Sequence, residues 1–395
     1  MPTKVLRTPA KLFVPAALFA VLTACGSNPP PVICALPASS SGSTCTCGSG
    51  AAACPVQPGP EFLYATSLSG QILAFSIDHD SGVLTAIGSV PGPSLSSGIT
   101  AVNNQFLFAS DTHNAQLDGF SINQTTGALT ALASSPFSTG TLSVPGDLAS
   151  PPESNLLYAS DAATVDAFTI SAAGVPTTLS GPPFLPEIGF SLTVDPSGEF
   201  LYATDVDPPG GIFAFTIDSA GALTAVPNSP FTIPGQTAVN SLPSGIVDSG
   251  SYVYAALYQT NQIAAFSIVS GTGALTPVPG SPFSAGTNPT AVVLAGNFVY
   301  AINSSNGSIS SDGTISGYSI NSTTGVLTPL SGSPFAISGF AMATDFLGEY
   351  LYVAAPDGIQ AYSVDSTTGA LTAVPGSPFL PGEATLLSVV QIPPP

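Results

Sequence analysis

Short apolar runs alternate with polar, glycine-rich turns from residue 61 to the last residues of the chain. Seven of these runs follow one pattern, in which an aromatic residue precedes Ser or Thr and then Ile or Val. Their aromatic residues lie 44 to 52 positions apart, at Phe75, Phe120, Phe168, Phe215, Phe266, Tyr318 and Tyr362. A period of this length in a chain rich in β-forming residues is typical of repeat architectures. The pattern therefore predicts seven copies of one small β unit.

Each repeat divides into four strand-like pieces. A run such as Phe200-Leu201-Tyr202-Ala203 precedes the aromatic run, and a Gly turn into Leu-Thr follows it, as at residues 221–224. Gly supplies the positive φ that a tight hairpin needs. The fourth piece is weaker, for example residues 289–294. Pro176 follows the turn of the third repeat, and Pro fits a strand only at an edge, so this piece should be outermost.

Four short strands that are apolar on both faces are typical of a β-propeller blade, which packs against a neighbour on each side. We therefore predict an all-β fold: a seven-bladed β-propeller of four-stranded blades over residues 61–395. The first repeat lacks an innermost strand, whereas the run at residues 384–392 has no blade of its own. This C-terminal strand should enter the first blade and close the ring.

A Ser-Pro-Phe phrase recurs after the Leu-Thr piece and before the fourth piece, with its aromatic residue at Phe137, Phe231, Phe283, Phe335 and Phe379. A phrase shared by most blades rarely encodes a site that exists once. We interpret it as a plug between blades, with Pro fixing the turn.

The first 24 residues have the pattern of a signal peptide. A short apolar run at residues 12–22 follows all the basic side chains of the chain, Lys4, Arg7 and Lys11. This order is typical of secretion, and the run is too short to span a bilayer. It ends at Leu22-Thr23-Ala24-Cys25, which resembles a bacterial lipobox. The resemblance implies a lipoprotein signal peptide over residues 1–24 and lipidation of Cys25, with plain secretion as the alternative.

We therefore expect a lipid-anchored protein of the bacterial cell envelope, periplasmic or at the cell surface. Gly26 does not match an inner-membrane retention signal, which favours the outer membrane. Residues 25–60 are rich in Pro, Ser and Gly, and we interpret them as a tether. This tether holds four more cysteines, Cys34, Cys45, Cys47 and Cys54. Two disulfides of open connectivity are expected; a metal site is the alternative, although the spacing lacks the paired gaps of zinc sites.

The charge of the chain limits the classes of partner that it can bind. Beyond residue 24 there is no Lys or Arg, while all 22 Asp and Glu residues lie there. Nucleic acids, anionic lipid surfaces and phosphorylated metabolites are bound largely through such cations. This acidic chain therefore favours neutral partners, namely a glycan, a peptide or a small lactone, and we expect a monomer.

The Tyr-Ala-Thr-Asp runs, the Phe-Ser-Ile strands and the Gly-Ala-Leu-Thr turns resemble those of seven-bladed lactonase-like propellers. That family includes 6-phosphogluconolactonases and exported propellers with Tyr-Val-Thr-Asn (YVTN) repeats. The resemblance covers residues 61–392 and includes a turn typical of the family at residues 195–202. It implies the fold and lactone hydrolysis, although a chain without cations is poorly suited to a phosphorylated substrate. No catalytic residue of the family can be assigned to a position in this chain.

Candidate chemistry lies where the repeats differ. We interpret the turns after the Tyr-Ala runs as joining a first strand to a second, which places them at the channel mouth opposite to the blade-to-blade returns. At one such turn Asp111 precedes His113, a candidate general base with its orienting partner. His79 is expected in a hairpin turn on the opposite face. The alternative for both histidines is a solvated loop side chain.

Asp205 and Asp207 lie in a Gly/Pro-rich loop that offers oxygen ligands to Ca²⁺, although a solvated acidic loop is the alternative. No cofactor is required by the pattern. Other acidic residues near these turns are Asp161, Asp312 and Asp357, and the longest insertion spans residues 303–313. No Gly-x-Ser-x-Gly nucleophile elbow is present.

Two functions remain open. The first is a lipid-anchored binding or scaffold module for a neutral ligand or an envelope partner. The second is a lactone hydrolase, a carboxylic ester hydrolase, that acts on a non-phosphorylated lactone. Whether the protein is an enzyme is not decided by its sequence.

Overall fold

Seven antiparallel sheets make up the structure, a computed structural model in which residues 59–138, 142, 144–161, 164–179, 188–206, 210–236, 242–304, 313–380 and 384–393 are described. The predicted signal peptide, the tether and all five cysteines lie outside these residues. Pro60–Pro393 form one unit. Among the residues described, no helix is long and apolar enough to cross a membrane.

Each sheet is one blade, and its four main strands follow one another from the innermost to the outermost. Blade 1 contains β30 (Ala384–Gln391), β1 (Glu61–Ser67), β2 (Gln71–Ile77) and β3 (Leu84–Pro91), and blade 2 contains β4 (Ile99–Val102), β5 (Phe106–Asp111), β6 (Gln116–Ile122) and β7 (Leu129–Ala131). Blade 3 contains β8 (Pro145–Ala149), β9 (Leu156–Asp161), β10 (Thr164–Ile170) and β11 (Pro176–Thr178), and blade 4 contains β12 (Ile188–Val194), β13 (Phe200–Asp205), β14 (Gly211–Ile217) and β15 (Leu223–Ala225). Blade 5 contains β17 (Pro243–Asp248), β18 (Tyr252–Leu257), β19 (Gln262–Val269) and β20 (Ala274–Pro277). Blade 6 contains β22 (Pro289–Ala295), β23 (Phe298–Asn303), β24 (Thr314–Ile320) and β25 (Leu327–Pro329). Blade 7 contains β26 (Ala341–Thr344), β27 (Tyr350–Ala355), β28 (Gly358–Val364) and β29 (Leu371–Ala373). The short strands β16 (Phe231–Thr232) and β21 (Phe283–Ser284) pair with β14 and β19.

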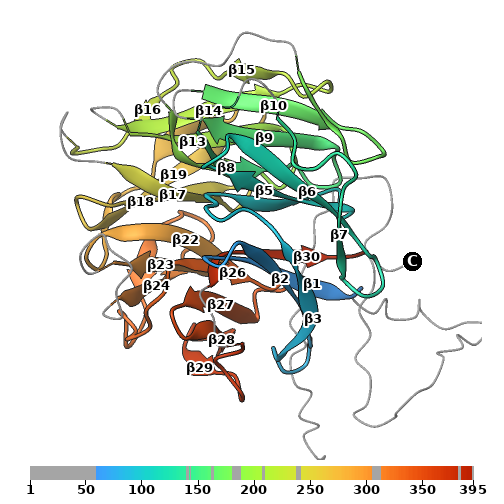
Figure 1. Ribbon diagram of the computed structural model, residues 1–395. Coiled ribbons are helices and arrows are strands. Elements are labelled where there is room, and N and C mark those ends of the chain that lie inside the picture. Colours follow the sequence, from blue (N-terminus) through green and yellow to red (C-terminus); the bar gives the residue numbers. More distant parts are fainter. Residues whose placement is uncertain are drawn as a thin grey trace, which may run out of the picture. The chain divides into compact units, whose positions relative to one another are not determined.

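The seven blades form a ring. Each innermost strand contacts the innermost strands of the two neighbouring blades. The ring is closed as predicted, because β30 pairs antiparallel with β1, and Figure 1 shows these two strands side by side in red and blue. Pro176 begins β11, the outermost strand of blade 3, which confirms its expected edge position.

The hydrophobic core lies between the blades. Seven clusters of buried side chains each draw on two adjacent sheets; one joins Tyr64 and Ile72 of blade 1 to Leu107 and Phe120 of blade 2. Side chains of a strand point alternately to the two faces of its sheet. Because both faces are covered, every residue of β5, β13, β18, β23 and β27 is buried. This double burial explains the apolar runs seen in each repeat.

Tyr hydroxyl groups link successive blades. In six blades a buried Tyr of the second strand donates to the carbonyl oxygen of the turn Gly in the next blade: Tyr64 to Gly127 (2.8 Å), Tyr158 to Gly221 (2.9 Å), Tyr202 to Gly273 (3.2 Å), Tyr254 to Gly325 (3.2 Å), Tyr300 to Gly369 (2.7 Å) and Tyr352 to Gly82 (3.2 Å). Blade 2 carries Phe108 at this position, and Phe has no hydroxyl group. The recurrent Tyr and the recurrent Gly are therefore the donor and the acceptor of one repeated hydrogen bond between neighbouring blades.

The turn Gly also has to be small. Gly273 has a φ of +68°, and a Cβ added to it would lie 2.3 Å from the Phe200 ring of the preceding blade. Gly271 of the same turn has a φ of +75°, but a Cβ there would meet nothing within 4 Å. Gly271→Ala should therefore carry only the left-handed backbone cost of about 1 kcal/mol. Gly273→Ala adds overpacking and should lower the free energy of unfolding by about 3 kcal/mol.

Urea denaturation of the two variants and the parent protein measures this difference. Equal losses in the two variants would contradict the close packing of Gly273 against Phe200.

The Ser-Pro-Phe phrases return to the third strand of their own blade. Their Phe residues pair with Leu117, Ile212, Ile263, Ile315 and Ile359. The Ser hydroxyl accepts the N–H of the third-strand residue two positions further on, as between Ser135 and Gly119 at 2.9 Å. The Ser-Pro peptide bonds are cis. Each Phe belongs to a cluster formed by two blades, which confirms the predicted plug.

The Tyr-Ala runs are second strands, so the prediction that their turns lie opposite to the blade-to-blade returns was wrong. The innermost strand precedes the Tyr-Ala run in the chain, and the turn after the run therefore lies on the side where the chain enters the innermost strand. At blade 2 the N–H of Thr112 donates to the carbonyl oxygen of Leu95 in such a return, at 3.1 Å. We call this side the return face, and the side of the hairpin turns between the third and fourth strands the hairpin face.

Candidate functional site

Three adjacent second strands end at the return face with a hydroxyl residue followed by Asp. They are Ser110-Asp111 in blade 2, Ser160-Asp161 in blade 3 and Thr204-Asp205 in blade 4, and all six side chains are buried. We call these residues, together with Asp118, Asp147 and Asp166, the acidic arc. The corresponding last residues in the other blades are Ser67, Leu257, Asn303 and Ala355. The arc is therefore confined to one part of the ring.

The hydroxyl groups of the arc bind the innermost strands or the returns that lead into them. The hydroxyl of Ser110 accepts the N–H groups of Ser97 (3.1 Å) and Gly98 (2.9 Å), and that of Ser160 accepts the N–H of Asp147 (2.8 Å). The pairing of β8 with β9 shifts register next to Asp147. A bulge of this kind leaves backbone groups without strand partners, and the hydroxyl satisfies one of them.

Asp111 does not orient His113. Its carboxylate accepts the N–H groups of His113 (3.1 Å) and Asn114 (3.0 Å) and the Asn114 side-chain amide (2.7 Å), so it holds the backbone of its turn. The His113 side chain is exposed to solvent. The hydrogen bonds of the Asp111 carboxylate therefore do not include the predicted one to the His113 imidazole.

The predicted calcium site is described only in part. Asp205 is buried at the end of β13, whereas Asp207 lies outside the described residues. Among the residues that are described, no three His, Cys, Asp or Glu side chains gather to hold a metal ion. Asp312 and most of the insertion at residues 303–313 are likewise outside them, and Asp357 accepts the Gln360 amide at 3.0 Å on the rim of blade 7.

Two carboxyl groups of the arc have raised pKa values. Burial, together with the nearby charge of Asp111, raises the pKa of Asp118 to about 6. Burial also raises the pKa of Asp147 to about 6, although its carboxylate accepts the Ser191 hydroxyl and the Leu192 N–H, both at 3.0 Å. These contacts tie β8 to β12 of the next blade. Carboxyl groups with such pKa values can exchange protons in the pH range where general acid–base catalysis operates.

Asp118, Asp147 and Asp166 were not predicted from the sequence as site residues. Asp118 and Asp166 occupy the same register position, opposite Ala109 and Ala159, inside third strands. A charged residue inside a strand that is otherwise buried was the available signal. The other blades carry Leu, Phe, Ala, Ser or Gln at this position.

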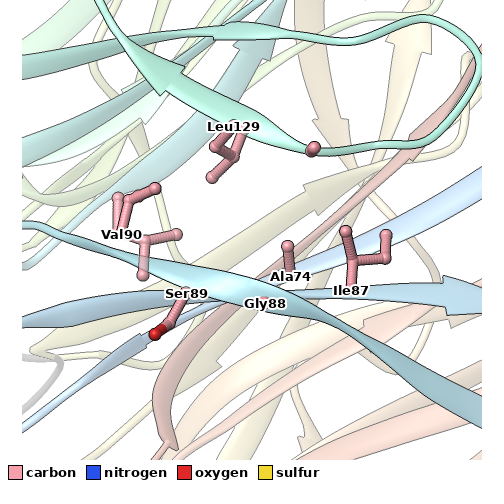
Figure 2. Close-up of a pocket in the computed structure, with 8 residues that line it drawn as sticks. Ala74, Ile87, Gly88, Ser89, Val90 and Leu129 are labelled. Carbon is pink, nitrogen blue, oxygen red and sulfur yellow. The ribbon is translucent and has the colours of Figure 1, made fainter.

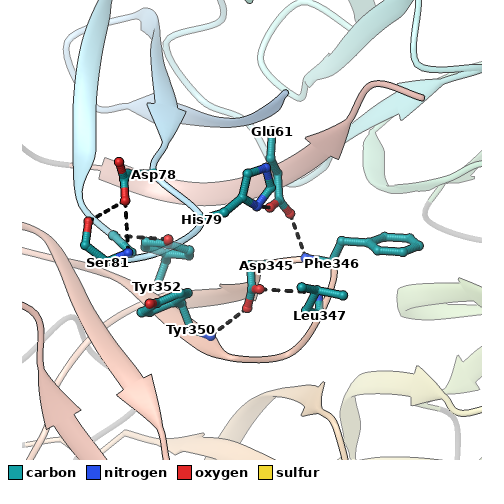
Figure 3. Close-up of polar contacts among 10 residues, drawn as sticks. Glu61, Asp78, His79, Ser81, Asp345, Phe346, Leu347, Tyr350 and Tyr352 are labelled. Carbon is teal, nitrogen blue, oxygen red and sulfur yellow. Dashed lines mark hydrogen bonds and ion pairs between the residues drawn. The ribbon is translucent and has the colours of Figure 1, made fainter. Parts of the chain in front are cut away.

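A carboxylate–imidazole pair does exist, built from the other histidine (Figure 3). The Nδ1 atom of His79 lies 3.3 Å from the carboxylate of buried Glu61, whose second oxygen accepts the N–H of Phe346 at 2.6 Å. Burial raises the pKa of Glu61 to about 7, and the charge of Asp345 adds to this, while Phe346 and His79 oppose it. The contact of Glu61 with Phe346 joins blade 1 to blade 7. His79 lies in a hairpin turn on the face opposite to His113, as expected. The carboxylate–imidazole pair is far along the blade from the acidic arc, because Glu61 begins β1 and the arc lies where second strands end.

Solved structures share the fold of the chain. Two proteins named "putative 6-phosphogluconolactonase", from Bacteroides fragilis and Bacteroides uniformis, match with TM-scores of 0.67 and 0.66 at 19% and 20% identity. The matches cover 84% and 85% of this chain and 98% and 100% of those chains. A periplasmic gluconolactonase of Pseudomonas aeruginosa matches with a TM-score of 0.64 at 18% identity, covering 85% of this chain and 99% of that one. No protein-family model and no curated protein matches the sequence. At these identities the likeness confirms the seven-bladed propeller fold.

Proposed function

We propose that the protein is an exported, lipid-anchored β-propeller that binds a neutral, hydroxyl-rich ligand at the acidic arc, such as a glycan or a sugar lactone. The observation that carries this proposal is the gathering of six Asp residues over three blades, in a chain without Lys or Arg beyond residue 11. Carboxylates accept hydrogen bonds from sugar hydroxyl groups, whereas they repel a phosphate. The lipid anchor at Cys25 would place this binding module in the cell envelope.

Calorimetric titration with neutral sugars and their 6-phosphates tests the proposal. Binding of at least one neutral sugar is expected, with affinity at least tenfold weaker for its phosphate because the arc and the phosphate are both negative. Asp118→Asn should weaken neutral-sugar binding, because an amide accepts fewer hydrogen bonds than a carboxylate. The control Glu349→Gln changes an exposed carboxyl group on the hairpin face and should leave binding unchanged. Tighter binding of the phosphate, or equal effects of the two variants, would contradict the proposal.

A second candidate function is hydrolysis of a neutral sugar lactone. It is favoured by the raised pKa values of Asp118 and Asp147, and by the gluconolactonase of P. aeruginosa among the proteins that share the fold. A carboxylate of the arc would remove a proton from water as the water attacks the lactone carbonyl. The same carboxyl group would then return the proton to the ring oxygen as the acyl C–O bond breaks, which leaves a carboxylic acid and a hydroxyl group.

Acid release from glucono-1,5-lactone, measured against spontaneous hydrolysis, tests this activity. A general base contributes about 10²- to 10⁴-fold to the rate, so Asp118→Asn should lose most of the catalysed rate if Asp118 is that base. Saturable binding of neutral or aryl lactones without their hydrolysis would contradict the lactonase activity and would support only the binding function.

A further inference from the structure

Blade 1 lacks the plug that is described in five other blades. The plug Phe of five blades pairs with the residue three positions before the aromatic of the third strand, for example Phe335 with Ile315. The same position in blade 1 is Ile72, and its partner is Val90. In this blade β3 is longer than the other outermost strands, and Ile87 forms a bulge in it. A short aliphatic side chain therefore stands where five other blades place a phenyl ring.

The space left by the missing ring is a pocket of about 200 Å³ between blades 1 and 2. Figure 2 shows Val90 and Ile87 on the β3 side and Leu129 on the β7 side, and Ala74 of β2 also lines the pocket. Ala74 corresponds in register to Gly317 of blade 6, where an added Cβ would lie 2.9 Å from the plug ring of Phe335. The plug ring and the pocket thus cover equivalent residues of their blades.

We propose that this pocket binds a small molecule through an unsubstituted phenyl ring. The pocket surface suits a phenyl ring, because the plug ring covers the equivalent surface in other blades. The lining side chains Ile72, Ala74, Ile87, Val90 and Leu129 are apolar, whereas Ser89 brings a hydroxyl group next to them. The size is sufficient, since an apolar protein cavity of about 150 Å³ binds benzene. The ligand is therefore a benzyl-type compound whose polar substituent remains in solvent, and this site is independent of the acidic arc.

Titration of the full chain with benzyl alcohol, followed by saturation-transfer NMR, tests the site. A ligand with so few atoms should bind with a Kd on the order of 1 mM. Val90→Phe restores a plug-like ring and should weaken binding at least tenfold. The matched control Thr85→Phe places the same ring on an exposed position of β3 and should leave binding unchanged. Soaking with iodobenzene should give one heavy-atom position, beside Val90.

Phe335→Val should open a second pocket in blade 6 and raise the number of bound rings from one to two. The proposal is overturned if benzyl alcohol shows no saturable binding, or if Val90→Phe binds it as tightly as the parent protein. An iodobenzene position elsewhere in the molecule would also overturn it. If Phe335→Val does not fold, Val90→Phe alone decides the test, because this variant adds a ring at the pocket and opens no cavity.

Discussion

A chain that ends at residue 383 should fail to fold, because it lacks the innermost strand of blade 1. The strand β30 contributes the buried side chain of Leu387 to the cluster between blades 7 and 1, and Val390 and the following Ile392 belong to the cluster between blades 1 and 2. Burial of each such side chain is worth about 1.5–3 kcal/mol, and the exposed edge of β1 adds unpaired backbone groups. The sum approaches the net stability of a typical domain, about 5–15 kcal/mol.

Soluble yield and circular dichroism of the truncated protein measure this effect. A chain that ends at Pro393 is the matched control and should fold normally, because β30 is intact in it. Addition of a synthetic peptide of residues 384–393 should restore part of the folded signal. A truncated chain with a cooperative unfolding transition close to that of the control would show that the ring does not depend on this strand.

The protein should gain at least about 3 kcal/mol of stability between pH 7.5 and pH 5, since one pKa unit corresponds to about 1.4 kcal/mol. Burial is the largest cause of the raised pKa values of four carboxyl groups: Glu61 and Asp248 to about 7, and Asp118 and Asp147 to about 6. Their ordinary values are near 4, so between pH 4 and 7 the folded state binds more protons than the unfolded state. Stability therefore falls as the pH rises through this range.

Urea unfolding at pH 5, 6 and 7.5 measures the slope. Glu61→Gln should flatten it and stabilise the protein at pH 7.5, because the amide oxygen still accepts the Phe346 N–H without a buried charge. Glu199→Gln changes an exposed carboxyl group and should leave the slope as it is. Higher stability at pH 7.5 than at pH 5 would refute the expectation. Below pH 4 the trend should reverse, because local hydrogen bonds hold the pKa values of Asp78 and Asp365 below their usual range.

The repeat pattern was sufficient to predict the blades and the closure of the ring. The strands that are buried on both faces must be apolar in every blade, so the same apolar pattern recurs in all seven repeats. The turns after the Tyr-Ala runs were predicted on the wrong face relative to the blade-to-blade returns. The innermost strands carry mixed residues such as Ser244, Asp147 and Thr290, and are therefore hard to number from the sequence. An error of one in the strand count moves a turn to the opposite face.

The candidate site was less predictable, because contacts between repeats leave no periodic signal. Glu61 and His79 are 18 positions apart, but Phe346 reaches Glu61 from the other end of the chain. Adjacency of Asp111 and His113 suggested a pair that the turn geometry does not form. Asp147 of blade 3 meets Ser191 and Leu192 of blade 4, and no local spacing in the sequence indicates this contact.

The Tyr–Gly contacts bear on how such a chain can lengthen by gene duplication. Six of the seven repeats carry the donor, a Tyr, on one side and the acceptor, a Gly turn, on the other. A copied unit of this kind therefore meets both of its new neighbours with matching groups, like a head-to-tail subunit in a cyclic oligomer. Tyr352 of the last blade finds the same partner in Gly82 of the first. The Tyr–Gly contacts therefore set no limit of their own on the number of blades.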